Sequence, residues 1–325
     1  MKTIVAVAIG AIGTHVITKK EDLNDAPARK VRRYLHGLVR GLNRRGYKFG
    51  ADPTNNKHFR IVFRLTNVAG LANAATFKDE TGMTNGDVIF CMSTRVTKEA
   101  GDRNLGVPIV GIVSEPPATF QVDPFCGVSA KRVQKAGDCF DNFRLAVPTL
   151  TKIFVLGNSN YNVSNRAKAK VTAAAQNAGN FAVPDIDVTA IADLEDMLAA
   201  ALTARTKNAP CTEGLLVLPV DMFLSRARKI IDLVQSELLV PTFFPVPDWV
   251  TGKPSSALGA YGVPQRRCGV LMAEQVHSIL ANNQIPQGAN RWIETPDYDL
   301  EFSTSTAAAA ELGITLGPDI PPPEE

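Results

Sequence analysis

Residues 151–170, TKIFVLGNSNYNVSNRAKAK, contain the pattern that decides the fold. Residues 153–156 form an unbroken apolar run, which is typical of a strand buried on both faces. A loop rich in Gly, Asn and Ser follows. A helix rich in Ala and Lys is predicted from Arg166, with Ser164 as its N-cap. A buried strand, a polar loop and a helix are the first half of a βαβ unit, so the segment predicts a parallel sheet.

The loop of this unit is the first candidate for a binding site. In open parallel sheets, ligands lie beyond the carboxyl ends of the strands. Asn158, Tyr161 and Asn162 are therefore placed where a small molecule could be held. Because Asn and Gly are also common turn residues, an ordinary solvated turn is the alternative interpretation of the loop alone.

The same alternation of strands and helices runs through both halves of the chain. The strands predicted in the first half are 4–12, 59–65, 87–91 and 108–113. Those predicted in the second half are 153–156, 185–188, 214–218, 241–244 and 258–263. The first half and the second half should therefore each build a parallel sheet with right-handed crossovers, and together they should enclose a cleft.

The composition excludes several classes of protein. The chain has 325 residues, 45% of them hydrophobic and 21% charged, as in soluble globular proteins. The net charge of +3 is too small to indicate a polyanionic partner. No apolar run reaches the roughly 18 residues that span a bilayer. The five cysteines form no CxxC pair, which argues against a metal cluster, and their odd number argues against a complete disulfide framework.

No enzyme motif survives inspection. The segment Gly10–Gly13 lacks the third glycine of a dinucleotide fingerprint, and P-loop, GxSxG and HExxH motifs do not occur. The four histidines do not have the spacing of metal ligands. We therefore expect no enzyme activity, no cofactor and no metal. An α/β enzyme that uses Glu115 or Asp221 as acid or base ranks last, since a carboxylate after a strand can equally bind a ligand amine.

A run of eight basic residues without an acid extends from Arg29 to Lys48. It coincides with an amphipathic helix predicted over residues 27–45. Such a run could bind phosphate, but more often it is the solvated side of a helix. No aromatic residues are interleaved with it in the manner of a nucleic-acid-binding module, so no nucleic-acid partner is predicted.

Several segments resemble one family of proteins. In the second half they are LTKIFVLGNSN at 150–160, the segment GLLVLPVDMFLSRARKIIDLVQSELLVPTFFP at 214–245, ALGAYGV at 257–263 and AAAAELGITLGPDIP at 307–321. In the first half they are NGDVIFCMSTRVTKEA at 85–100 and VPIVGIVSEPP at 107–117. These segments are similar to the ABC-transporter substrate-binding proteins that include tryptophan- and tyrosine-binding members. The resemblance implies the α/β type I periplasmic-binding-protein architecture: two Rossmann-like lobes with parallel sheets, a three-segment hinge and a ligand between the lobes.

The resemblance also implies domain boundaries. We expect residues 1–118 and 264–298 in the N-terminal lobe, and residues 119–263 and 299–325 in the C-terminal lobe. The hinge should then include strands near Phe120, Val263 and Phe302.

The ligand should be held by polar side chains at the strand ends and by aromatic walls. By position, Ser93 and Thr94 match a polar loop of the family, and Asn158 matches its asparagine, whereas Gly157 and Ser159 replace its usual Tyr and Pro. An amino acid would need a carboxylate for its ammonium group, donors for its carboxylate, and Phe or Tyr walls. The expected ligand-binding residues are His15, Ser93, Thr94, Ser114, Glu115, Asn158, Tyr161, Asn162, Asp221, Phe223, Asp248 and Tyr261. For each, the alternative is a loop group bonded to its own backbone.

The expected function is that of a substrate-binding protein of an ABC-type transport system. It would bind a small polar organic ligand, with an amino acid as the first choice, by hinge closure, and it would deliver the ligand to an ABC permease. The alternative is a cytosolic sensor or a self-assembling scaffold with the same fold. The family is exported, which implies a periplasmic or extracytoplasmic location. This sequence shows no convincing signal-peptide cleavage site, so a cytoplasmic location is the alternative.

Overall fold

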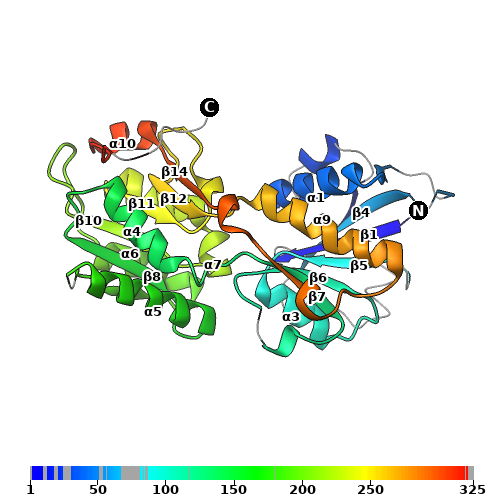
Figure 1. Cartoon of the computed structure of the whole chain (residues 1–325). Coiled ribbons are helices and arrows are strands. Elements are labelled where there is room, and N and C mark those ends of the chain that lie inside the picture. Colours follow the sequence, from blue (N-terminus) through cyan, green and yellow to red (C-terminus); the bar gives the residue numbers. More distant parts are fainter. Residues whose placement is uncertain are drawn as a thin grey trace. The chain divides into compact units, whose positions relative to one another are not determined.

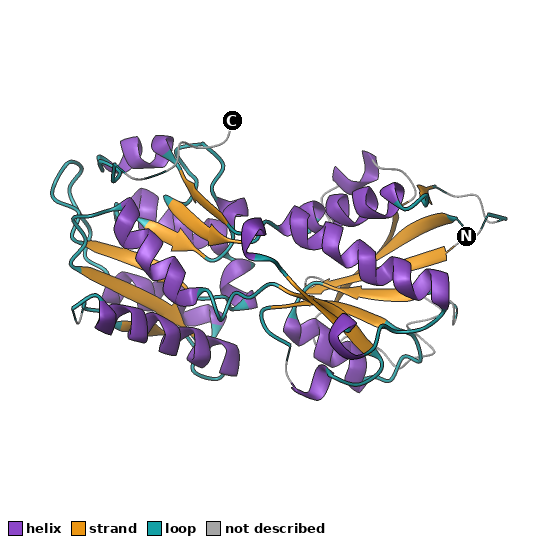
Figure 2. Cartoon of the chain, viewed as in Figure 1, coloured by secondary structure: helices purple, strands orange, loops and turns teal. Residues whose placement is uncertain are grey.

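Buried apolar strands build two separate sheets in a computed structural model of the chain (Figure 2). The structure describes residues 2–9, 13–17, 21–24, 31–50, 54–55, 57–66, 81–82, 84, 87–116, 118–179, 181–318 and 320. The chain divides into two units. The first unit contains Met1–Ala130 and Gln265–Thr295, and the second contains Lys131–Pro264 and Pro296–Glu325. The chain therefore passes between the units three times.

The sheet of the first unit is mostly parallel. Its strand order is β13-β7-β6-β5-β1-β4-β2, with β3 also beside β4. The strands are β1 (Lys2–Ile9), β2 (Gly13–Ile17), β3 (Lys48–Phe49), β4 (His58–Thr66), β5 (Val88–Cys91), β6 (Ile109–Val113), β7 (Phe125–Ser129) and β13 (Trp292–Glu294). Only the edge strand β2 pairs antiparallel among the described strands of this sheet. Residues of β1, β5 and β6 such as Val5, Ile89 and Ile109 have no exposed surface, as their apolar runs predict.

Two helices from distant parts of the sequence cover one face of this sheet. Helix α1 (Arg32–Arg44) lies side by side with α9 (Gln265–Asn282), and α3 (Thr94–Asp102) lies on the other face (Figure 1). The helices α1 and α9 touch through glycines. A Cβ atom on Gly37 would lie 2.1 Å from the Arg266 carbonyl oxygen, and one on Gly269 would lie 2.1 Å from that of Tyr34. Glycine at these positions lets the two backbones approach each other.

The second unit repeats the architecture. Its strand order is β14-β12-β11-β10-β8-β9, and only β14 runs antiparallel among the described strands. The strands are β8 (Lys152–Gly157), β9 (Asp185–Asp187), β10 (Glu213–Val217), β11 (Thr242–Phe244), β12 (Gly259–Gly262) and β14 (Glu301–Thr304). The helices include α4 (Ala136–Ala146), α5 (Asn162–Asn177), α6 (Leu194–Ala201), α7 (Asp221–Leu224), α8 (Ala227–Ile231) and α10 (Thr306–Leu312). Phe143 of α4 stacks on Phe243 of β11, with ring centroids 5.0 Å apart, and so joins helix and sheet.

The α/β class and the paired parallel sheets predicted from the sequence are confirmed, but two of the crossings lie elsewhere. The first lies after residue 130 instead of residue 118, and the third lies after residue 295 instead of residue 298. The reason is pairing: β7 forms parallel ladders with both β6 and β13 inside the first sheet. The second crossing lies after residue 264, one residue from the predicted position.

Two of the predicted hinge residues do not lie at a crossing. Phe120 is 2% exposed and stacks on Phe125, with ring centroids 4.5 Å apart, in the core of the first unit. Phe302 lies in β14, opposite Tyr261 in the second sheet. Phe120 is therefore a core residue of the first unit and Phe302 a half-buried residue of the second sheet, whereas Val263 lies next to a crossing.

Two element boundaries near the predicted site also differ. The first strand ends at Ile9, and Gly13–Ile17 is a separate strand. Helix α5 begins at Asn162, four residues before the predicted start, with Tyr161 as its N-cap residue. Ser164 is inside the helix, where its Oγ accepts a hydrogen bond from the Asn158 N–H at 2.8 Å. The predicted cap is therefore wrong: Ser164 ties the helix back to the strand exit.

Candidate functional site

The first unit brings four of the predicted residues to one edge of its sheet. β5 and β6 are parallel neighbours, with Cys91 opposite Gly111. Ser93 and Thr94 follow β5, and Ser114 and Glu115 follow β6 directly. All four therefore leave the sheet at its carboxyl edge. Whether they contact a ligand stays a prediction.

These residues are held by the local backbone. Ser93 is the N-cap of α3, and its Oγ accepts a hydrogen bond from the Val96 N–H at 3.2 Å. The O–H of Ser93 can still donate, since a hydroxyl is both donor and acceptor. Ser114 is buried, and Thr94 and Glu115 are half-buried. A small polar molecule at this edge would meet hydroxyl groups and one carboxylate.

His15 does not belong to this edge. It lies in β2, opposite Phe63 of β4, and Ala6 of β1 pairs with the same residue. Its backbone is therefore level with Ala6, three residues before β1 ends. The prediction that His15 follows the first strand is wrong, because the chain turns back and adds an edge strand.

Asn158 follows β8, and its side-chain amide is hydrogen-bonded at both ends. Its Oδ1 accepts a hydrogen bond from the Asn160 N–H at 3.0 Å. Its Nδ2 donates to the Thr189 carbonyl oxygen at 3.4 Å and to Met222 Sδ at 3.2 Å. The residue is 1% exposed. The amide therefore shapes the loop from a buried position, unlike the side chain of an ordinary solvated turn.

The other predicted residues of the second unit occupy different positions along its carboxyl edge. Tyr161, half-buried, and Asn162, exposed, begin α5 after β8. Asp221 begins α7 after β10, and Asp248 lies in the short helix Pro247–Trp249 after β11; both are half-buried. Because β8, β10 and β11 are parallel neighbours, these four residues lie at one edge of the sheet.

Phe223 lies elsewhere. Its side chain has no exposed surface and packs in the core cluster of the second unit. The expectation that Phe223 forms an aromatic wall of the site is therefore wrong. Its apolar character serves the packing of α7 on the sheet.

Tyr261 is part of a charged cluster that the sequence analysis missed. Lys131 and Lys135 Nζ each lie 3.7 Å from an Asp297 carboxylate oxygen, and Lys135 Nζ lies 3.2 Å from Asp138 Oδ2. Burial, and next the charge of Asp138, raise the pKa of Tyr261. Burial lowers the pKa of Lys135, but the hydrogen bond and charge of Asp138, with the charge of Asp297, outweigh it and leave that pKa raised.

This cluster gathers the three segments at which the chain enters or leaves the second unit. Lys131 is the first residue of the unit, Tyr261 precedes the second crossing, and Asp297 follows the third. Lys131, Lys135 and Asp138 lie close in sequence, just before and at the start of α4, whereas Tyr261 and Asp297 come from distant segments. Since Tyr261 and Asp297 each lie more than a hundred residues from the other three members, no local pattern could have revealed the whole cluster.

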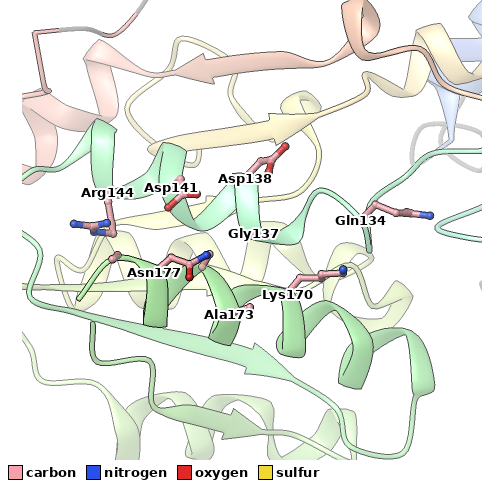
Figure 3. Close-up of a pocket in the computed structure, with 10 residues that line it drawn as sticks. Gln134, Gly137, Asp138, Asp141, Arg144, Lys170, Ala173 and Asn177 are labelled. Carbon is pink, nitrogen blue, oxygen red and sulfur yellow. The ribbon is translucent and has the colours of Figure 1, made fainter. Parts of the chain in front are cut away.

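A groove of about 450 Å³ lies on the helix layer of the second unit, between α4 and α5 (Figure 3). Its floor is made of small residues, and Figure 3 shows Asp138, Asp141 and Arg144 on one side and Lys170 and Asn177 on the other. The remaining lining residues are Gln134, Gly137, Ala173, Ala174 and Ala178. None of the twelve predicted ligand residues lines it, so we do not assign the ligand site to this groove.

The described residues also bear on metal binding and on thiol reactivity. Among them, no group of His, Cys, Asp and Glu side chains could hold a metal ion. Burial raises the pKa of the Cys126 thiol to about 12 and of the Cys211 thiol to about 11, so these thiols are protonated at neutral pH and weak nucleophiles. In the part of the chain that the structure describes, no helix has the length and apolar character needed to cross a bilayer.

Comparison with known proteins shows the fold. No protein-family model matches the sequence. No curated protein matches it either. Among solved structures, the chain is similar to an ABC domain from Streptococcus pneumoniae in complex with L-Trp (TM-score 0.69, 15% identity, 97% of this chain and 95% of that one). It is also similar to a conserved domain protein from Vibrio cholerae (TM-score 0.68, 16% identity, 98% and 96%).

Transcriptional regulators have the same architecture. A probable maltose operon transcriptional repressor from Staphylococcus aureus is similar over 94% of this chain and 97% of that one, with a TM-score of 0.59 and 12% identity. An L-Trp-bound ABC domain and a repressor are therefore both similar to this chain, and at these identities the likeness concerns the fold. The chain has the α/β fold of the type I periplasmic-binding proteins.

Proposed function

We propose that this protein is a non-enzymatic receptor for a small polar organic molecule and acts as the substrate-binding protein of an ABC-type transport system. One observation carries the proposal: in both units, hydroxyl and carboxylate side chains gather at the carboxyl edge of a parallel sheet. That edge is where ligands bind in α/β sheets. A similar structure holds L-Trp, which supports a ligand of amino-acid type.

The residues at these edges suit a ligand with an ammonium and a carboxylate group. Glu115, Asp221 and Asp248 are half-buried, and their carboxylates can accept hydrogen bonds from an ammonium group. The Ser93 and Thr94 hydroxyls can donate to a ligand carboxylate. Tyr161 and Tyr261, both half-buried, can contact the apolar part of the ligand.

Ligand binding by both edges would favour a closed state of the protein. A ligand shifts a conformational equilibrium only as far as it binds one state better than the other. A molecule that contacts Glu115 of the first unit and Asp221 of the second stabilises the state in which both contacts exist. Closure of this kind would present one surface to an ABC permease only when ligand is bound.

A ligand-responsive sensor is the second candidate, because the repressor structures share the fold. The two functions predict the same ligand chemistry but different partners. Capture of a permease by the ligand-loaded protein supports transport. Sensing is supported if ligand has no effect on permease association but changes the interaction with a regulatory partner.

A thermal-shift screen against the amino acids and small polar amines tests the receptor. A ligand at 100 times its dissociation constant adds about 2.7 kcal/mol to the free energy of unfolding. The matching variants are Glu115→Gln and Asp221→Asn, with Asp196→Asn on the exposed side of α6 as the control. We expect the first two to weaken binding at least tenfold and the control to bind as the unchanged protein does. A screen without any shift, or equal affinity in all three variants, contradicts the proposal.

A further inference from the structure

The small net charge of the chain conceals a strongly basic helix layer on the first unit. Helices α1 and α9 contain six arginines, one glutamate and no lysine. Arg45 follows α1 directly and forms an ion pair with that glutamate, Glu274, at 3.1 Å. The short helix Glu21–Asn24, which contacts α1, contributes Glu21 and Asp22. Counting all these residues, the layer keeps an excess of four positive charges, more than the +3 of the entire chain.

These arginines form one surface on a rigid support. The two helices run parallel, since Gly37 faces Gly269 and Gly41 faces Ala273, and these close contacts fix the spacing of the helices. Arg33, Arg40 and Arg44 of α1 and Arg266 of α9 are exposed. We name these four residues the arginine face. It combines segments more than two hundred residues apart, so only the fold brings it together (Figure 1).

The positive potential of this layer already affects a neighbouring group. His277 of α9 lies against Tyr47, with ring centroids 5.7 Å apart. Its pKa is lowered by burial and then by the charges of Arg45 and Lys57. Both charges that lower the pKa of His277 are positive, which agrees with an excess of positive charge at this end of α1.

The chemistry of the arginine face suits phosphate groups. The guanidinium group binds phosphate oxygens through two parallel hydrogen bonds and stays charged at all relevant pH values. Apolar insertion is not available: among the described residues, the exposed large hydrophobic side chains are Val16, Val122, Leu145, Ile191, Met197 and Tyr298, and none lies on α1 or α9. A partner must therefore bind by charge.

The shape of the layer distinguishes between two kinds of phosphate-bearing partner, nucleic acids and membranes. Two helices side by side, each about 10 Å across, are too broad for a DNA major groove of about 12 Å. No exposed aromatic side chain on α1 or α9, as far as the structure describes them, offers a base-stacking platform for a single strand. A flat anionic bilayer accepts a broad basic surface without either feature. We propose that the arginine face docks the first unit on the phosphate headgroups of an anionic membrane surface.

The test is vesicle co-sedimentation of the full chain. Vesicles of phosphatidylglycerol and phosphatidylcholine in equal parts are compared with vesicles of phosphatidylcholine alone, at low and at high salt. We expect binding to the anionic vesicles only, and loss of binding at high salt, because screening shortens the range of surface charges. Absence of binding to the anionic vesicles at low salt overturns the proposal.

Charge-reversed variants separate the surface from the net charge. The variant Arg40→Glu, Arg44→Glu and Arg266→Glu reverses three charges of the arginine face. The control Lys170→Glu, Lys207→Glu and Lys253→Glu reverses three exposed charges of the second unit. Since one basic residue near an anionic surface changes affinity about fivefold, the first variant should bind at least about 100-fold more weakly, and the control should keep most of its affinity. An equal loss in both variants contradicts the proposal.

Two further measurements keep the result unambiguous. Thermal unfolding must be cooperative in both variants, and the milder Arg40→Gln, Arg44→Gln and Arg266→Gln variant should show an intermediate loss of vesicle binding.

Duplex DNA, single-stranded RNA and polyglutamate are offered at the same salt. Stronger binding to any of them than to the anionic vesicles overturns the membrane as the partner. Ligand binding in the thermal-shift screen should be unchanged in the arginine variants, so this proposal and the receptor function can fail separately.

Discussion

At the residue scale, Asn158 shows how a binding-site pattern can be a loop-building pattern. An asparagine directly after a buried strand is where a ligand contact is expected. The structure instead uses both ends of its amide, with Oδ1 on the Asn160 N–H and Nδ2 on the Thr189 carbonyl oxygen and on Met222 Sδ. Sequence alone could not separate these roles, because the partners come from the loops after two other strands. Asn158 therefore positions the loop that begins α5.

Replacing Asn158 by alanine should destabilise the protein by about 1–3 kcal/mol, because buried polar groups lose their partners. Urea unfolding measures the change. The matched control is Asn160→Ala, which removes an exposed amide of the same loop and should cost less than about 0.5 kcal/mol. Equal costs for the two variants would show that the Asn158 amide does not hold the loop.

Tyr261 gives a pH-dependent prediction. Its folded-state pKa is raised above the usual 10.0, mainly by burial and then by the charge of Asp138. The folded protein therefore keeps the phenol proton when the unfolded chain has lost it. The stability that depends on this group is complete below about pH 10 and falls as the pH rises through the folded-state pKa.

Urea unfolding between about pH 9 and 11.5, a window that brackets the usual phenol pKa, measures this loss. Tyr261→Phe should lose stability less steeply in that window than the unchanged protein. Asp138→Asn should lower the Tyr261 pKa, whereas Asp141→Asn, on the same helix but not among the groups that shift Tyr261, should leave it unchanged. If both substitutions shift the pKa equally, the specific role given to Asp138 is wrong.

At the element scale, the apolar runs predicted the central strands because burial on both faces leaves a continuous signal in sequence. β1, β5, β6, β8 and β10 all follow from such runs. The strands β7 and β13 did not, although the three-residue edge strand β9 was predicted. β7 is a five-residue strand that follows Pro124 directly, and β13 has three residues whose described strand pairing is with β7. The positions of the loops at the carboxyl edges could be predicted from the strands that precede them. The Lys131–Lys135–Asp297 cluster could not, because it depends on contacts between distant segments.

The packing of α1 on α9 predicts a severe effect of a small change. Gly37→Ala would place a methyl group 2.1 Å from the Arg266 carbonyl oxygen, so one of the two backbones must move. Overpacking of this kind costs about 1–3 kcal/mol, which urea unfolding measures. The control is Gly50→Ala, where the nearest atom lies 3.9 Å away and little change is expected. A Gly37→Ala variant as stable as the control would show that the helices are more loosely packed than described.

At the scale of the whole molecule, both units are assembled from separated parts of the chain. The first needs Gln265–Thr295 for α9 and β13, and the second needs Pro296–Glu325 for β14 and α10. A cut at the first crossing therefore does not release a complete unit. The discontinuous division predicted from the sequence has this character, with the first crossing displaced from residue 118 to residue 130.

The fragment of residues 1–130 should not fold alone, because α1 would expose the glycine-lined face that packs on α9. Circular dichroism and urea unfolding of the fragment should show no cooperative transition. Joining residues 265–295 to the fragment through a flexible linker should restore one. Cooperative unfolding of residues 1–130 alone would contradict this dependence.

The separation of α1 from α9 also has a consequence during synthesis. Roughly 220 residues lie between them, and a ribosome adding about 5–20 residues per second needs about 10–45 s to make that stretch. Throughout this time the nascent first unit presents the apolar side of α1 without its partner helix. Production of this protein should therefore respond to chaperones that shield emerging polypeptides, and slowing translation should increase, not decrease, its tendency to aggregate.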